Sequence, residues 1–290
     1  MTEQPPASEE GPLALICGGG SLPLAVADYA AAHGREVVLF PLRGAAEGMA
    51  VERYRHHWIY VGQIGKLMRL ARAAGCRDIV FIGSLVRPAF WHVRPDFAAL
   101  TALPKVLAAF RGGDDHLLTS VARMIEENGF RLRGAHEVAP EILFPRMSLG
   151  AHSPSAAAYV DIAFGFDYLR VAGPFDIGQA VVVADKHILA VEAAEGTDAM
   201  LERVSQLRAN GRLKTATGKG VLVKAAKPGQ DRRFDLPSIG PHTVEGVARA
   251  GLDGIAVAAG ESIVAEPEKL VRAADRAGIF VVGVAPASAP

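Results

Sequence analysis

The chain has 290 residues, of which 50% are hydrophobic and 21% are charged, and its 31 basic side chains balance 31 acidic ones. This composition is typical of a globular protein, the length exceeds that of one typical domain, and the zero formal net charge argues against a nucleic-acid-binding protein. The two cysteines, Cys17 and Cys76, lie far apart in apolar patterns. Their spacing predicts neither a zinc site nor a disulfide framework and favours a reducing, cytoplasmic location.

The N-terminal residues 1–12 are acidic and proline-rich and lack a basic start. We therefore expect a disordered leader rather than a secretion signal. No apolar run approaches the ~18 residues of a membrane-spanning helix. Phe90 and Trp91 lie near Arg87 and Arg94 in a proline-containing segment, which suits contact with a membrane surface and equally an ordinary core-edge or interdomain segment.

The first half of the chain alternates apolar runs with helical patterns. In order, these predict strand 13–17, helix 22–32, strand 36–41, helix 65–74, strand 78–82, helix 117–128 and strand 130–132. Strands that alternate with helices favour a parallel sheet, so residues 13–135 are predicted to form a Rossmann-like domain. Prolines and glycines interrupt residues 136–155, which are predicted to be a linker.

Two glycine-containing loops follow the first and third predicted strands. Gly19 and Gly20 allow close approach of a backbone, and Ser21 is placed to cap a helix whose positive end favours an anion. Gly83 and Ser84 also follow the carboxyl end of a strand, so the two loops can lie side by side over one crevice. A tight turn without a ligand explains the same glycines.

Asp114 and Asp115 follow a pair of glycines just before the helix 117–128. Acidic side chains at this place can line a ligand site. They can also serve only as helix caps, because the helix dipole favours negative charge at its start.

A second α/β domain is predicted over residues 156–290. Its elements, in order, are helix 156–170, strands 179–184 and 187–192 joined by a tight turn at Asp185-Lys186, helix 199–210, strand 221–223, helix 243–250, strand 254–258, helix 267–277 and strand 279–284. Thr197 or Asp198 is placed to cap the helix 199–210.

The segment 219–241 concentrates charge directly after an apolar strand. Lys224, Lys227, Asp231 and Asp235 lie in it among prolines and glycines. Loops that follow strand ends commonly hold ligands in α/β proteins, and mixed basic and acidic side chains suit a phosphorylated substrate with a bound metal. A solvated loop whose charges pair with one another is the alternative.

The chain resembles the LpxI family, the UDP-2,3-diacylglucosamine pyrophosphatases, in five segments that occur in the same order: ICGGGSLP, FIGSLVRP, RGGDDHLL, GQAVVVADKHILAVEAAEGTDAML and KPGQDRRFDLPSIGPHTVEGVARAGLDGIAV. The resemblance implies hydrolysis of the pyrophosphate bond of UDP-2,3-diacylglucosamine by metal-assisted attack of water, with Mg²⁺ as the usual ion. The products would be UMP and 2,3-diacylglucosamine 1-phosphate, which is lipid X. It also implies a substrate held between two domains, a homodimer, and transient contact with the cytoplasmic face of the inner membrane through the acyl chains.

Carried over onto the matching motifs, the resemblance implies a set of site residues. Asp231 is the best single catalytic candidate, as a metal ligand or a water-orienting base, and Lys224 and Asp198 are further catalytic candidates. The implied metal ligands are Asp231, Asp235 and Asp198. The implied substrate contacts are Gly19, Gly20, Ser21, Gly83, Ser84, Asp114, Asp115, Thr197, Lys227 and Gln230.

The first glycine-containing unit leaves a second hypothesis open, an NAD(P)- or nucleotide-binding Rossmann-type oxidoreductase or sensor. The run GGGS lacks the G-x-G-x-x-G spacing, and no acidic residue ends the second strand to hold a ribose. Hydrolase signatures such as G-x-S-x-G and H-E-x-x-H are absent, as is the P-loop motif.

Overall fold

The computed structural model describes residues 11–84, 94, 96, 114–175, 177–227, 230–234 and 236–285, with only the backbone for residues 114–119. The chain divides into two compact units. Unit 1 is Met1–Pro140 together with Asp231–Phe234, and unit 2 is Glu141–Gln230 together with Asp235–Pro290. Both units combine helices with a sheet, so the predicted α/β class and two-domain architecture are confirmed.

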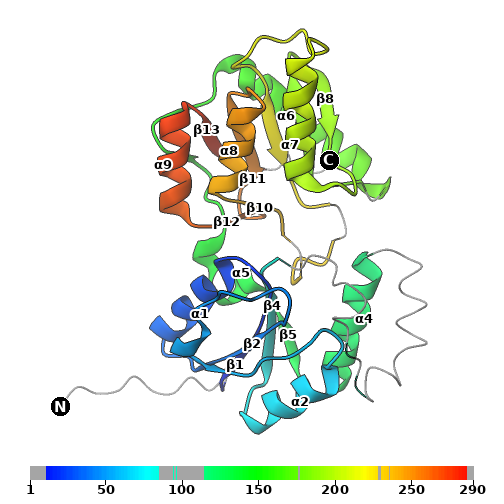
Figure 1. Cartoon of the computed structure of the whole chain (residues 1–290), viewed down its shortest axis with the longest axis vertical. Helices are drawn as coiled ribbons and strands as arrows, with labels where there is room; N and C mark the ends of the chain where they lie inside the picture. Colours follow the sequence, from blue (N-terminus) through cyan, green and yellow to red (C-terminus); the bar gives the residue numbers. More distant parts are fainter. Residues whose placement is uncertain are drawn as a thin grey trace, which may run out of the picture. The chain divides into compact units, whose positions relative to one another are not determined.

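The described residues of unit 1 form a sheet of five parallel strands in the order β3-β2-β1-β4-β5 (Figure 1). Its strands are β1 (Leu13–Cys17), β2 (Val37–Pro41), β3 (Arg55–His56), β4 (Asp78–Ile82) and β5 (Arg131–Arg133). Its helices are α1 (Leu22–Ala32), η1 (Val51–Arg53), α2 (Ile64–Ala73), α4 (Asp114–Glu127) and α5 (Ala135–Val138), and η3 (Pro140–Ile142) follows. The central β1, with β2 on one side and β4 on the other, gives the Rossmann-like arrangement that the alternation predicted.

Strand β1 is buried on both faces, as expected for a parallel sheet covered by helices. Side chains alternate along a strand, so Ala14 and Ile16 point to one face. There they pack in one core cluster with Leu67 of α2 and Ile125 of α4. Because both faces of the strand are buried, the run 13–17 is apolar at every position.

A buried carboxylate ties three parts of unit 1 together. Asp78, at the start of β4, is only 1% exposed and accepts hydrogen bonds from Arg35 and from Arg131, whose Nε lies 2.7 Å away. The Arg35 side chain is itself 10% exposed and also donates to the carbonyl of Gly11. Removing one member of such a buried pair is costly, because the other charge stays in a low-dielectric environment.

The described residues of unit 2 form a mixed sheet in the order β6-β13-β11-β9-β7-β8 and a small parallel pair, β10-β12. The strands are β6 (Ser148–Leu149), β7 (Ala180–Ala184), β8 (His187–Val191), β9 (Val221–Lys224), β10 (Ser238–Ile239), β11 (Gly254–Ala258), β12 (Ile263–Val264) and β13 (Phe280–Val284). The helices are α6 (Ala156–Ala172), η4 (Gly173–Phe175), α7 (Gly196–Ala209), α8 (Pro241–Arg249) and α9 (Pro267–Ala277). Strands β9, β11 and β13 are parallel, whereas β6 and β7 run antiparallel to their neighbours.

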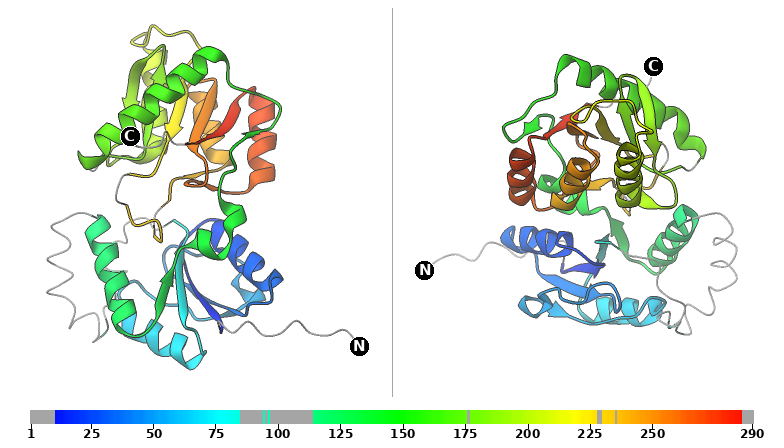
Figure 2. Two further views of the ribbon diagram at one scale, coloured as in Figure 1. Left: turned by 180° about the vertical axis from the view of Figure 1, so that it is seen from behind. Right: turned by 45° about the horizontal axis from the view of Figure 1, so that its top comes forward.

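Helices cover the two faces of this sheet unequally. Met200 of α7, Val247 of α8 and Leu270 of α9 pack in one core cluster, and Ile162 of α6 packs in a separate cluster on the other face. The left view of Figure 2, which is seen from behind, shows α6 crossing the sheet on that face. No helix in the described part of the chain is both long enough and apolar enough to span a bilayer.

The turn between β7 and β8 confirms the predicted Asp185-Lys186 hairpin. Both residues adopt positive φ angles, 50° and 60°, which fit a two-residue type I′ turn. The carboxylate of Asp161, on α6, accepts hydrogen bonds from the backbone N–H groups of Asp185 at 2.9 Å and Lys186 at 2.7 Å. These bonds compensate for the backbone conformation, which is uncommon for residues other than glycine.

Candidate functional site

The carboxyl ends of β8 and β9 lie at one edge of the unit 2 sheet, because both strands run antiparallel to β7 between them. Lys224 is the last residue of β9 and is only 7% exposed. Its Nζ donates to the Thr197 hydroxyl at 3.0 Å and to the Ser238 carbonyl at 3.2 Å. The structure therefore brings together Lys224 and Thr197, two predicted site residues, at the start of α7.

Glu192, directly after β8, extends this contact. The Thr197 hydroxyl donates to Glu192 Oε1 at 2.9 Å, and the backbone N–H of Gln179 donates to Glu192 Oε2 at 3.0 Å. The apolar pattern before Glu192 predicted only that a strand ends there. The sequence held one signal for Glu192, since it is a carboxylate at the end of a predicted strand. That this strand ends at the same edge as Lys224 follows only from the strand order.

Asp198 lies in the first turn of α7 with its side chain 68% exposed. Its carboxylate is 3.6 Å from His242 Nε2, and His242 Nδ1 is 3.4 Å from Glu245 on the same helix, α8. Ion pairs this exposed contribute little stability. The arrangement nevertheless places the imidazole of His242, which no sequence motif predicted as a site residue, beside a predicted catalytic carboxylate.

Asp231 lies in the part of the charged loop that belongs to unit 1. Arg233 pairs with it through Nε at 3.0 Å and Nη2 at 2.7 Å, and also donates to Glu126 of α4 at 2.6 Å. The hydrogen bonds from Arg233 lower the pKa of the Asp231 carboxyl below its usual value. Phe234 packs against Phe81 with ring centroids 5.4 Å apart, which holds this segment on unit 1.

Lys227 and Gln230 flank two residues that the structure does not describe. The Gln230 side chain accepts from the Lys227 backbone N–H at 3.1 Å, and the Gln230 N–H donates to the Lys227 carbonyl at 3.2 Å. These two bonds link Lys227 to Gln230, which is the last residue of unit 2 before the segment 231–234. Asp235 lies outside the described residues.

The two glycine loops of unit 1 bond to each other. Gly19 N donates to the Ser84 carbonyl at 2.7 Å, and Ser84 N donates to the Gly19 carbonyl at 2.9 Å. A Cβ atom at Gly18 would lie 2.4 Å from the Ser84 carbonyl oxygen, and one at Gly83 would lie 2.7 Å from that of Gly19. Close approach of the two loops thus explains these glycines, and contact with a substrate stays a prediction.

Ser21 lies at the N-cap of α1, but its side chain makes no capping hydrogen bond, so the expectation that it caps this helix is wrong. It adopts a helical backbone conformation there, with φ −88° and ψ −20°, whereas capping side chains usually extend from a β-region backbone. Asp114 and Asp115 form the first turn of α4, which begins earlier than predicted, and their side chains lie outside the described residues.

The predicted metal ligands do not form a ready-made site in the described part of the chain. No group of three or more His, Cys, Asp or Glu side chains suited to a metal occurs there. Both carboxylate oxygens of Asp231 bond to Arg233, so a metal at Asp231 would compete with a guanidinium. Asp198 belongs to unit 2 and Asp231 to unit 1, so their convergence stays a prediction.

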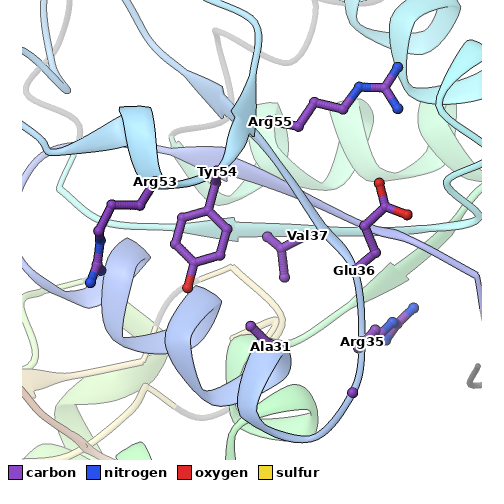
Figure 3. Close-up of a pocket in the computed structure, with 8 residues that line it drawn as sticks. Ala31, Arg35, Glu36, Val37, Arg53, Tyr54 and Arg55 are labelled. Carbon is purple, nitrogen blue, oxygen red and sulfur yellow. The ribbon is translucent and has the colours of Figure 1, made fainter. Parts of the chain in front are cut away.

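Unit 1 also contains a hollow of about 490 Å³ at the amino ends of β2 and β3 (Figure 3). It is lined by Ala31, Gly34, Arg35, Glu36, Val37, Arg53, Tyr54 and Arg55. The guanidinium of Arg53 and the hydroxyl of Tyr54 bond to Asp28 at 2.8 and 2.6 Å. Because the glycine loops leave the carboxyl ends of β1 and β4, this hollow is not the crevice that the sequence predicted.

Comparison with known proteins identifies the family. The models of the LpxI N-terminal domain and the LpxI C-terminal domain match residues 12–142 and 145–282. The chain belongs to the LpxI family. A curated relative, the UDP-2,3-diacylglucosamine pyrophosphatase LpxI of Caulobacter vibrioides, is 43% identical over 278 residues, which are 96% of this chain and 99% of the relative.

The boundary between the two LpxI domain models, near residues 142–145, lies close to the division of the chain after Pro140. Two solved structures show a distant likeness. WbmG of Bordetella bronchiseptica with NAD and UDP covers 43% of this chain and 37% of its own, with 16% identity and a TM-score of 0.28. The UDP-glucose-4-epimerase of Stenotrophomonas maltophila with NAD covers 90% and 91%, with 11% identity and a TM-score of 0.31. Structural similarity at this level gives no information about the function of the chain.

Proposed function

We propose that the protein hydrolyses the pyrophosphate bond of UDP-2,3-diacylglucosamine and releases UMP and 2,3-diacylglucosamine 1-phosphate, lipid X. Support comes from the relative of that name, which is 43% identical over almost the whole of both chains. Within the structure, the observation that carries the proposal is the buried Lys224 ammonium, held at the end of β9 beside the start of α7.

Lys224 has the chemistry that a diphosphate requires. An ammonium in a partly dry environment attracts a phosphate more strongly than one in water, and a fixed position means that little reorganisation accompanies the reaction. The start of α7 adds the positive end of a helix dipole next to the same side chain. We propose that Lys224 contacts the diphosphate through its ammonium and Thr197 through its backbone N–H in the first turn of α7, with Lys227 and Gln230 as further substrate contacts.

Asp231 and Asp198 are the proposed catalytic carboxylates. The pKa of Asp231 is lowered by Arg233, so this group stays ionised but is a weak base. A weak, ionised carboxylate suits charge stabilisation or orientation of a water better than removal of its proton. We propose that role for Asp231, and that Gly19, Gly20, Ser21, Gly83, Ser84, Asp114 and Asp115 contact the substrate from unit 1.

We further propose that turnover depends on Mg²⁺ or another divalent cation, for which Asp198, Asp231 and Asp235 are the candidate ligands. When bound, such a cation neutralises charge on a diphosphate and polarises its oxygens. Because Arg233 occupies both oxygens of Asp231, metal binding at this residue requires that the ion pair opens.

The acylated substrate and the exposed apolar side chains of unit 2 lead to two proposals about binding partners. Tyr159, Val160 and Val171 of α6 and Phe175 beyond it are 48%, 46%, 63% and 76% exposed. Four exposed apolar side chains on and next to one helix support contact with another apolar surface. We propose that the protein is a homodimer and that it contacts the inner membrane transiently while it takes up its acylated substrate; light scattering and vesicle flotation test these proposals separately.

Incubation of the purified protein with UDP-2,3-diacylglucosamine tests the main proposal. UMP should appear in the presence of Mg²⁺ and should stop appearing when EDTA is added. A Lys224→Met variant, which keeps most of the side-chain volume, should fold normally and release UMP at least 100-fold more slowly. Absence of UMP from the wild-type reaction would refute the proposed function, and full activity in EDTA would refute the metal requirement alone.

The alternative of a dinucleotide-binding protein rests on the strand order of unit 1. Leu42 and Arg43 follow β2, so no carboxylate stands there to hold a ribose. Titration with NADH and NADPH separates the two hypotheses, since saturable binding of either would favour the alternative and the hydrolase predicts none.

A further inference from the structure

Glu192, Thr197 and Lys224 form a chain of hydrogen bonds in which each proton has a defined place. An ammonium can only donate, so the 3.0 Å contact between Lys224 Nζ and Thr197 Oγ1 uses a lone pair of the hydroxyl. The single hydroxyl proton then points elsewhere, and Glu192 Oε1, at 2.9 Å, accepts it. Glu192 thus keeps the oxygen lone pairs of Thr197 turned toward Lys224.

The Glu192 side chain is itself confined on the opposite side. Its second oxygen, Oε2, accepts from the backbone N–H of Gln179 at 3.0 Å. A Cβ atom at Gly178 would lie 2.4 Å from Glu192 Cγ, 2.7 Å from its Cβ and 2.8 Å from its carbonyl oxygen. Only glycine at position 178 therefore allows the Glu192 side chain to lie where it meets both Gln179 and Thr197.

The backbone supports the same geometry. Glu192 N donates to the Ala180 carbonyl at 2.9 Å and Gly178 N donates to the Glu192 carbonyl at 3.0 Å. In the sheet, Ala180 pairs with Lys224. Glu192 and Lys224 are thus both anchored to the start of β7, and Thr197 links their side chains.

We propose that Glu192 is a positioning residue of the hydrolase, which orients the Thr197 hydroxyl and, through it, holds the Lys224 ammonium where a diphosphate binds. The proposal rests on the proposed function. Glu192 does not itself touch the substrate in this proposal, because a carboxylate would repel a diphosphate. Its contribution passes through Thr197, so it should vanish when the Thr197 hydroxyl is removed.

A double-mutant cycle tests this dependence. Glu192→Ala and Thr197→Val should each lower kcat/KM about 10- to 100-fold, the range expected for loss of a hydrogen bond that involves a charged group. The combined variant should be no more than about threefold worse than the poorer single variant, because both changes break one chain of contacts. Thr197→Ser restores the hydroxyl and should recover most of the kcat/KM that Thr197→Val loses.

Gly178→Ala provides a variant that leaves the three side chains intact. Its methyl group displaces Glu192, so kcat/KM should fall as it does in Glu192→Ala. The matched control is Glu195→Gln, at the start of the same helix, because Glu195 bonds to Arg203 and to the Ala193 N–H rather than to Thr197. Its kcat/KM should stay within about twofold of wild type. Thermal unfolding of every variant shows whether the fold is kept.

The outcomes separate the two proposals. A wild-type enzyme that releases no UMP overturns the proposed function and the role of Glu192 with it. An active wild type in which the losses of Glu192→Ala and Thr197→Val multiply overturns the positioning role alone, since independent residues have independent effects. Unchanged kcat/KM in folded Glu192→Ala has the same consequence.

Discussion

Asp253 offers a quantitative test of the structure through the pH dependence of stability. It lies just before β11, where its backbone N–H donates to Gly220 at 3.0 Å and its carbonyl accepts from Phe280 at 3.1 Å. Its buried Oδ1 has no hydrogen-bond partner among the described residues. Burial, together with the nearby Asp161 carboxylate, raises the pKa of Asp253 from 3.8 to about 6.

The sign of the effect follows from proton linkage. The folded state binds the proton of Asp253 more tightly than the unfolded chain, so this group favours folding below about pH 4 and loses that contribution as pH rises through about 6. A shift of roughly two units corresponds to about 3 kcal/mol. Since the side chain is only partly buried, solvent screening reduces the expected loss to about 1 to 2 kcal/mol.

Asp253→Asn removes the charge and keeps the size of the side chain. We expect the variant to exceed wild type in free energy of unfolding by about 1 to 2 kcal/mol at pH 7.5, and to match it within about 0.5 kcal/mol near pH 4. Urea titrations followed by far-UV circular dichroism at several pH values measure this difference.

Two controls make the result specific to unit 2. The tryptophans of the chain, Trp58 and Trp91, both precede residue 141, so their fluorescence follows unit 1 and should show the same transition in variant and wild type. Asp167→Asn, on α6 with a 65% exposed side chain, should change stability by less than about 0.5 kcal/mol at either pH. A stability difference between Asp253→Asn and wild type that is independent of pH would contradict a raised pKa at Asp253.

Three further predictions concern unit 1 and its loops. Asp78→Ala leaves a buried guanidinium without its carboxylate and should lower the free energy of unfolding by about 3 to 5 kcal/mol, measured in urea by tryptophan fluorescence. Arg233→Ala removes the group that lowers the pKa of Asp231, so the acidic limb of the kcat/KM–pH profile should move to higher pH; an unmoved limb would show that ionisation of Asp231 does not govern activity. Gly18→Ala places a methyl group against the Ser84 carbonyl and should cost about 1 to 3 kcal/mol, detectable as a lower melting temperature; an unchanged melting temperature would contradict the close loop contact.

Local sequence patterns were sufficient to predict most of the long helices and strands. Strand β1 is apolar throughout, β4 is apolar after Asp78 and β9 is apolar up to Lys224. The helices between the strands show a helical period, so both α/β units could be predicted. The hairpin turn at Asp185-Lys186 was also predicted, because two polar residues between apolar runs favour a tight turn. The two-residue strands β3, β6, β10 and β12 were missed, since two residues show no period.

The candidate site contains contacts that local sequence patterns do not predict. The sequence pointed to Lys224 and Thr197 separately, through a strand end and a helix start. Glu192 was missed because its residue type does not predict that it accepts a hydrogen bond from Thr197. Asp231 was expected to bind a metal, and its hydrogen bond with Arg233 was not predicted for the same reason.

Residue order and short-range periodicity were enough to predict the family, the α/β class and the polar residues that follow strand ends. The contact of Lys224 with Thr197, 27 positions earlier, and the packing of residues 231–234 on unit 1 are visible only in the folded molecule. Contacts between distant residues depend on strand order and on how well side chains fit together. Neither property is encoded in any single segment.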